Sequence, residues 1–532
     1  MGDQDDKYIL AIDLGTSAAK VALVSVRGEV VAWESEPLPL HVLPNGGAEQ
    51  DPQDWWKGIL GAAKRVLGKG LVPSENVVAV CAGTTGEGTV PVDRDGNCLM
   101  NAMIWLDMRG AEFVKKRVSG LLSVEGYDVF KLQRSLRITG GMPLLHGKDP
   151  IGHTLYIQSE RPEIYRQAYK LLDVIDYVDF RLTGRFITTI DTKSFWWVVD
   201  IRDLANAVYH DGMIKEWGLD RDKLPELRRC IDVVGTLKPD VADELGLGHD
   251  VKVIAGGYDL PLAAVGSGAV EDYSASLSIS TSSFLTVHVP FKKVDIFHIM
   301  ASLPGAIPNR YFLVSEQETA GGNLVFFRDN LLYHKDALLE VEPPSRYFEA
   351  VNEVAESVPP GSNGLIYTPW IYGEFSPVSD PWIRGGIHNL SLGNTRGDLV
   401  RAIMEGVAYN TRWVLEPMEK FCGRTLSPIN IAGGGANSTL WCQIHADVLN
   451  RVIRRVKDPI QAVARGAAFI ASVGLGLIKF EDIPRLIEFE GEYSPNPDNR
   501  ELYDDLFAEF VNLYKQNKRI YERLNRSRLK EH

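Results

Sequence analysis

Polar residues gather in short turns that follow apolar segments, and the first of these turns could hold phosphate. Asp13-Leu14-Gly15-Thr16-Ser17 comes directly after the apolar segment 8–12, and Lys20 follows it. Backbone N–H groups in such a turn bind anionic oxygens well because these donors are already fixed, and glycine allows a close approach. A carboxylate such as Asp13 can hold a hydrated magnesium ion. The turn therefore predicts a phosphate-binding site.

Similar turns recur in the second half of the chain. Thr281-Ser282 separates two apolar segments, and Gly433-Gly434-Gly435 follows the apolar segment 429–431. For one isolated turn, a hairpin whose polar side chains bond to their own backbone would be the better interpretation. Repetition in this order favours a duplicated ATPase. Neither GxxxxGK[ST] nor GxGxxG follows a predicted strand, which disfavours P-loop and Rossmann folds.

Strands and helices with clear sequence signals position these turns. Segments 8–12 and 21–26 predict a β-hairpin with the first turn at its tip. Asp51-Pro52, Thr395 and Ser438 each predict the start of a helix. The Gly- and Ala-rich segment 254–268 separates two halves of similar organisation. We therefore predict a domain of residues 1–258 and a second domain of residues 259–532.

Composition narrows the functional classes. A chain of 532 residues exceeds what a single hydrophobic core normally serves, so two domains are expected. The net charge of −13 argues against nucleic acid and anionic membranes as partners. No apolar segment reaches the ~20 residues of a membrane span, and the acidic start does not resemble a secretory signal. The five cysteines form no CxxC pair. We expect a cytoplasmic protein with reduced thiols.

Several motifs together resemble the FGGY family of carbohydrate kinases, and within it the xylulokinases. The motifs occur in the family's order and are Asp13–Ser17, Ala48–Pro52 with Trp55-Trp56, Trp105–Arg109, Gly256–Asp259 and Gly433–Asn437. The resemblance implies an α/β fold of two ribonuclease-H-like domains, of the actin and hexokinase ATPase type, that flank a catalytic cleft. It also implies that ATP phosphorylates a hydroxyl group of a small sugar in this cleft.

The resemblance further implies a role for individual residues. Asp259, in the family's GGxD motif, would be the catalytic base and would contact the sugar. As a helix N-cap its carboxylate would have a depressed pKa and stay ionised. Asp13 would hold Mg²⁺ through water. The residues implied for ATP are Asp13, Gly15, Thr16, Ser17, Lys20, Thr281, Ser282, Gly434, Gly435 and Asn437. Those implied for the sugar, besides Asp259, are Glu87, Trp105, Asp107 and Arg109.

Two departures from the family pattern leave the substrate open. Ser280 stands where the family usually has glycine, and Gly86-Glu87 stands where xylulokinases carry Met-His and glycerol kinases carry Arg-Glu. We favour a ketopentose such as xylulose over glycerol, erythritol or another polyol. Two alternatives are an actin-like nucleotide switch without sugar kinase activity, and a family member that binds sugar but is inactive. A small sugar or polyol is the expected partner, a homodimer is considered, and neither nucleic acid nor membrane is expected.

Overall fold

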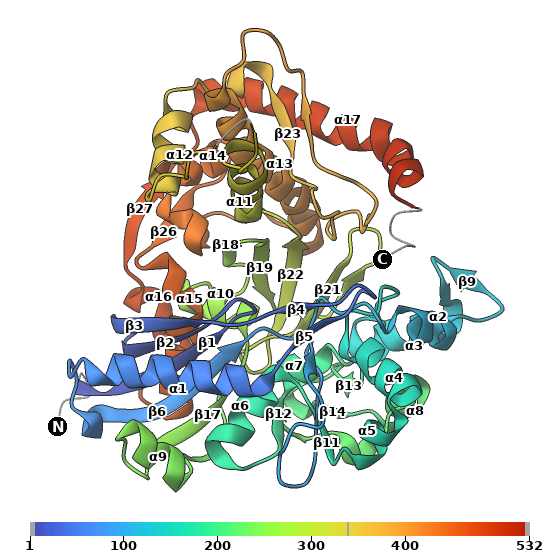
Figure 1. The fold of residues 1–532 in the computed structure, drawn as a ribbon, viewed down its shortest axis with the longest axis vertical. Coiled ribbons are helices and arrows are strands. Elements are labelled where there is room, and N and C mark those ends of the chain that lie inside the picture. The colour runs from blue at the N-terminus through green and yellow to red at the C-terminus, as the bar shows by residue number, and fades with distance from the viewer. Residues whose placement is uncertain (1–5, 338–339, 527–532) are drawn as a thin grey trace.

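A computed structural model describes residues 6–337 and 340–526, so most of the acidic start of the chain lies outside the described residues. Two α/β bodies follow one another along the long axis of the molecule (Figure 1). Each is built around one large twisted sheet. The N-terminal half forms the lower body in this view and the C-terminal half the upper one.

The first sheet contains the predicted N-terminal hairpin. Its strand order is β16-β17-β6-β1-β2-β3. The strands are β1 Tyr8–Leu14, β2 Ala18–Ser25, β3 Val30–Pro37, β6 Val77–Thr84, β16 Val233–Thr236 and β17 Lys252–Tyr258. Strands β1 and β2 are antiparallel, which confirms the hairpin, whereas β1 and β17 both run parallel to β6. The carboxyl ends of β1, β6 and β17 therefore meet at one edge of the sheet.

The second sheet repeats this arrangement. Its order is β20-β21-β22-β19-β18-β25-β26-β27. The strands are β18 Ala275–Ile279, β19 Ser283–Val289, β20 Val294–Asp295, β21 Met300–Pro304, β22 Tyr311–Gln317, β25 Ile429–Ala432, β26 Ile453–Val456 and β27 Phe489–Tyr493. As β1 does with β2 and β6, β18 pairs antiparallel with β19 and parallel with β25. The predicted duplicated α/β fold is confirmed.

The predicted helix starts are also confirmed. Helix α1 (Pro52–Gly68) begins after Asp51, whose side chain accepts a hydrogen bond from the Gln53 N–H group. A capping box of Thr395 and Asp398 precedes α13 (Arg396–Cys422), and Ser438 caps α14 (Thr439–Leu449). Apolar residues at helical spacing then bury one side of α1, with Trp55 and Ile59 almost fully enclosed.

The remaining helices cover the sheets or form an insertion in the first body. Between β6 and β16 lie α2 Ala111–Val118, α3 Val129–Thr139, α4 Pro150–Glu160, α5 Pro162–Gln167, α6 Val174–Thr183, α7 Ile190–Ser194 and α8 Asp211–Trp217. Elsewhere lie α9 Pro239–Leu245, α11 Gly321–Phe327, α12 Tyr347–Glu356, α16 Ile483–Leu486 and α17 Arg500–Asn525. Among the described helices, none combines the length and the apolar character that crossing a membrane would need.

Two helices interlock the bodies. Helix α10 (Asp259–Gly266) leaves the first sheet at β17 and packs against β18 and β19, whereas α15 (Ala462–Gly474) packs against β1 and β6. The two helices cross at glycines. A Cβ atom on Gly266 would lie 1.8 Å from the Ala462 carbonyl oxygen, and one on Gly466 would lie 1.9 Å from that of Leu262. Only glycine allows this close crossing, and it fixes how the two sheets face each other.

We predict that Gly266→Ala lowers the free energy of unfolding by ~1–3 kcal/mol or more, because the added methyl group overlaps backbone atoms that cannot rotate away. Urea denaturation followed by tryptophan fluorescence measures the change. Gly68→Ala at the end of α1 is the control, since no atom lies within 4 Å of the added Cβ atom. Equal stability of the two variants would contradict a tight crossing.

Candidate active site

The first site element is a pair of carboxylates at the edge where β1, β6 and β17 end. Asp13 lies opposite Gly83 of β6, and Gly83 lies opposite Gly257 of β17, which places Asp13 and Asp259 on neighbouring chain ends. The Lys20 Nζ atom is 2.8 Å from Asp13 Oδ2. The charge of Asp13 raises the pKa of Lys20, and Asp259 adds to this effect against the cost of burial. The three predicted residues thus share one electrostatic environment.

The structure corrects the prediction for the protonation of Asp259. Tyr258 occupies the N-cap position, and Asp259 is the first residue of α10. The Leu260 N–H group does lower the pKa of Asp259, as a helix start should, but burial and then the charge of Asp13 outweigh it. The pKa of Asp259 is therefore raised to about 7 instead of being depressed. Such a group can gain or lose a proton near neutral pH.

The first phosphate turn is held by Trp105, a predicted sugar residue, and by Gln50 of the Ala48–Pro52 motif. The Trp105 indole N–H group donates to the Thr16 hydroxyl over 3.0 Å, and the Gln50 amide donates to the Thr16 carbonyl oxygen over 2.8 Å. Ser17 is exposed, and a Cβ atom on Gly15 would approach only the Ala18 carbonyl oxygen. Trp105 thus holds the turn at Thr16, while Ser17 stays accessible.

The turns of the second sheet also lie together at one edge. Thr281 and Ser282 follow β18, while Gly434, Gly435 and Asn437 follow its parallel neighbour β25. The Thr281 carbonyl oxygen accepts hydrogen bonds from Ala320 and Gly322 at the start of α11. Thr281, Gly434 and Asn437 are exposed, and nothing lies within 4 Å of a Cβ atom on Gly434. The predicted adenosine turn is therefore open to a ligand.

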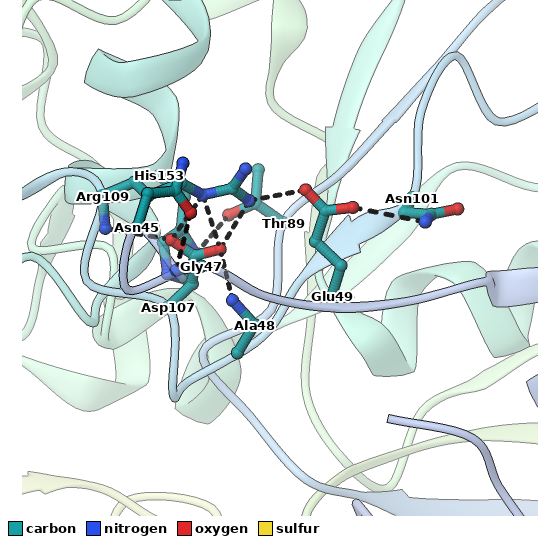
Figure 2. Close-up of polar contacts among 9 residues, drawn as sticks. All are labelled: Asn45, Gly47, Ala48, Glu49, Thr89, Asn101, Asp107, Arg109 and His153. Carbon is teal, nitrogen blue, oxygen red and sulfur yellow. Dashed lines mark hydrogen bonds and ion pairs between the residues drawn. The ribbon is translucent and has the colours of Figure 1, made fainter. Parts of the chain in front are cut away.

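Arg109 is the centre of a buried ionic cluster (Figure 2). Its guanidinium group contacts Asp107 Oδ2 at 2.6 Å and Glu49 Oε1 at 2.7 Å, and Asp107 also accepts a hydrogen bond from Ala48. Burial lowers the pKa of Arg109, but the hydrogen bonds and charges of Asp107 and then Glu49 outweigh burial and raise it. Asp107 is fully buried. Its oxygens are engaged in holding Arg109, while direct sugar binding by Asp107 stays a prediction.

The structure explains why Gly86 departs from the family pattern. A Cβ atom on Gly86 would lie 2.3 Å from the Tyr258 ring, which packs over the loop after β6 and also contacts Phe195. Tyr258 is the variable residue of the GGxD motif. It occupies the space that a larger side chain at position 86 would need, and Glu87 next to it adopts a positive φ of 60°. The two positions are sterically coupled.

Sequence reasoning missed two buried carboxylates that hold these loops. Asp191 accepts hydrogen bonds from the Tyr258 N–H group at 2.9 Å and from the Cys230 thiol at 3.1 Å. Asp173 accepts from the Gly88 N–H group at 3.1 Å and from the Trp196 indole at 3.0 Å. The only available signal was the Asp-x-x-Asp capping box of α6 at Asp173. Trp196 is accordingly buried in the core and offers no face to a ligand.

Family models match nearly the whole chain. The model of the N-terminal domain of the FGGY family of carbohydrate kinases matches residues 8–266, and the model of its C-terminal domain matches residues 275–475. The chain belongs to the FGGY family of carbohydrate kinases. It is a sugar kinase, and the family membership predicted from the motifs is confirmed. The predicted boundary between residues 258 and 259 falls where β17 ends and α10 begins, and it stays a prediction.

Similar proteins agree with this assignment. The chain is 28% identical over 526 residues to a xylulose kinase of Staphylococcus epidermidis, covering 97% of this chain and 98% of the relative. A gluconate kinase structure from Lactobacillus acidophilus has a TM-score of 0.83 at 24% identity, covering 97% of this chain and 99% of its own. A ligand-bound xylulose kinase from the same organism also has a TM-score of 0.83, at 24% identity and coverages of 97% and 100%. These two structures share the fold.

We predict that kcat/KM for the sugar rises with pH and levels off above about 7, the pKa of Asp259. Below this pKa the carboxyl group is protonated and cannot accept a proton, so kcat/KM should fall about tenfold per pH unit. Initial rates at saturating ATP measure it. Samples held at about pH 5.5 and returned to about pH 8 should regain full activity. A flat profile over this range would contradict the assignment.

We predict that Gly86→Met lowers kcat/KM by about 10²-fold, because the new side chain displaces the Tyr258 ring and with it Asp259. The double variant Gly86→Met with Tyr258→Ala should recover part of the loss, because the space of the ring becomes free. A double-mutant cycle on kcat/KM measures the coupling between the two positions. Additive losses would show that the ring does not transmit the effect.

Proposed function

We propose that this kinase transfers the terminal phosphoryl group of ATP to a hydroxyl group of a ketopentose such as xylulose. The observation that carries the proposal is the half-buried Asp259 carboxylate at the seam of the two bodies, beside Asp13 and Lys20. Similarity to xylulose kinases along 97% of the chain supports the choice of sugar. The alternative substrates are glycerol, erythritol or another polyol.

Asp259 would act as the base. Phosphoryl transfer passes through a loose transition state, so the protein mainly aligns the acceptor hydroxyl group, stabilises charge and removes one proton. The ionised Asp259 accepts the proton of the sugar hydroxyl group as this oxygen bonds to phosphorus. Its raised pKa of about 7 leaves a substantial ionised fraction at neutral pH, and a depressed pKa would make it a weaker base.

The turns of both sheets would hold the nucleotide. Gly15, Thr16, Ser17 and Lys20 contact the phosphates from the first body, and Thr281 and Ser282 contact them from the second. Gly434, Gly435 and Asn437 line the adenosine pocket. Backbone donors suit this role because their orientation is fixed before the phosphates arrive. The charge of Lys20, kept by the pairing with Asp13, favours the anionic phosphate end.

The donor set fits a magnesium ion held through water. No three His, Cys, Asp or Glu residues of the described chain form a metal-binding group. We therefore consider an ion that is held mainly by water and by the phosphates. Asp13 supplies one carboxylate, 5% exposed, where the phosphates are proposed to lie. Mg²⁺ prefers this kind of site, with water and phosphate oxygens as its other ligands. When bound, it neutralises phosphate charge.

Glu87, Trp105, Asp107 and Arg109 would form the sugar side of the site. Glu87 is the residue with a free carboxyl group among them, because Asp107 and Arg109 bind each other and Trp105 binds Thr16. We propose that Glu87 forms hydrogen bonds with hydroxyl groups of the substrate directly. The other three residues would position the loops around the sugar. A cytoplasmic location and a homodimer stay predictions.

We predict that Asp259→Asn retains the fold and ATP binding but loses at least about 10³-fold in kcat, because the hydroxyl group then has no base. ADP release is measured with xylulose, ribulose, glycerol, erythritol and gluconate, and without any sugar. The wild-type protein should release ADP only with sugar present, most rapidly with a ketopentose. Equal ADP release without sugar would favour a nucleotide switch, and near-native turnover of Asp259→Asn would remove Asp259 as the base.

A further inference from the structure

We propose that Glu316 of the second body faces Glu87 of the first across the sugar side of the site, and that this pair selects an uncharged sugar or polyol over a sugar acid. The inference rests on the proposed function, since it concerns the acceptor substrate of the same site. It adds a specificity-determining residue that no motif of the sequence pointed to.

Strand pairing brings Glu316 to this place. Glu316 is near the end of β22 and lies directly opposite Phe284 of β19, so both side chains point to the same face of the sheet. Phe284 and Tyr258 both pack against the small apolar cluster of Leu260, Ala264 and Phe312. Tyr258 in turn lies over Gly86, beside Glu87. The charges of both glutamates, one from each body, act on Tyr258.

A cross-domain contact lies beside the pair. The Lys148 Nζ atom of the first body is 3.9 Å from Glu318 Oε1 of the second and 5.3 Å from the centre of the Tyr372 ring. The charge of Lys148 acts on both Glu87 and Glu316. Since Lys148 already pairs with Glu318, it is not a free cation that could neutralise a carboxylate of the substrate.

The neighbouring carboxylates have hydrogen-bond donors within the protein, whereas Glu87 and Glu316 do not. Asp149, Asp173 and Glu374 are buried, and each accepts several hydrogen bonds from N–H groups of the chain. Among the described residues, neither Glu87 nor Glu316 has a hydrogen bond or ion pair to its carboxyl group. Both side chains are half-buried. A ligand with hydroxyl groups that covers them would supply the missing hydrogen-bond partners.

The electrostatics favour an uncharged ligand. Burial raises the pKa of Glu87 well above its ordinary value, and the charges of Asp149 and Glu316 raise it further. Burial and the charge of Glu318 likewise raise the pKa of Glu316. Protonated carboxyl groups both donate and accept hydrogen bonds, as sugar hydroxyl groups do. A substrate carboxylate would instead lose its water shell among acidic groups, beside a lysine that is already paired with Glu318, which is costly.

The test compares one uncharged substrate with one sugar acid of similar size. Rates are measured with the best uncharged sugar or polyol of the panel and with gluconate, for the wild-type protein, Glu316→Leu and Glu316→Asp. Glu353→Leu is the control, because Glu353 is an exposed residue of α12. Thermal midpoints and KM for ATP are measured alongside, since a purely structural role would change these as well.

We expect the wild-type protein to prefer the uncharged substrate by at least about 100-fold in kcat/KM, because a buried unpaired charge is expensive. Glu316→Leu, which removes the hydrogen-bonding group, should raise KM for that substrate about tenfold while changing kcat and KM for ATP less than about twofold. The preference over gluconate should narrow in Glu316→Leu and persist in Glu316→Asp, which keeps the carboxyl group. Glu353→Leu should match the wild-type protein.

Two results would overturn this inference while leaving the proposed function intact. One is a wild-type protein that phosphorylates gluconate as well as the uncharged substrate. The other is an unchanged sugar KM and an unchanged preference in both Glu316 variants. A wild-type protein that phosphorylates gluconate alone, or no sugar at all, would instead refute the proposed function itself, whatever the variants do.

Discussion

The parallel alignment of β1, β6 and β17 is the constraint on which the site depends. Hydrogen bonding between these strands sets Asp13, Gly83 and Gly257 side by side, so the residues that follow them must emerge at one edge. Residues far apart in the chain are thereby brought together without any contact between their own side chains. The second sheet applies the same rule to the turns after β18 and β25.

The crossing of α10 and α15 brings the site edges of the two sheets together. Because Gly266 and Gly466 let the helices approach backbone to backbone, α10 can pack on the second sheet and α15 on the first. Asp259 is the first residue of α10 and therefore lies at the seam. Its burial there raises its pKa, so the packing that joins the bodies also sets the proton affinity of the proposed base.

Acidic side chains at the seam divide into two groups with different physical roles. Asp173 is engaged by N–H groups and Asp191 by an N–H group and a thiol, and the two hold the loops that carry Gly88 and Tyr258. Glu87 and Glu316 have no such partners within the described chain, and their carboxyl groups are left for a substrate. Whether an acidic residue has a structural role or is left for the substrate therefore depends on the hydrogen-bond donors around it and not on its residue type.

The sequence by itself determined the elements and most of the chemistry. Local signals suffice for the hairpin at the first turn, for the caps at Asp51, Thr395 and Ser438, and for the duplicated α/β organisation, because they depend on residues close in the chain. Family motifs gave the kinase class, which the family models confirm.

Only the tertiary structure decided the environment of each group. The depressed pKa expected for Asp259 was wrong, because burial and Asp13, both products of the fold, outweigh the local helix start. The departure at Gly86 became intelligible only with the Tyr258 ring in place. Glu316 carried no sequence signal, since its position opposite Phe284 comes from strand pairing. Desolvation, steric fit and long-range charge depend on residues distant in the chain, which local patterns do not encode.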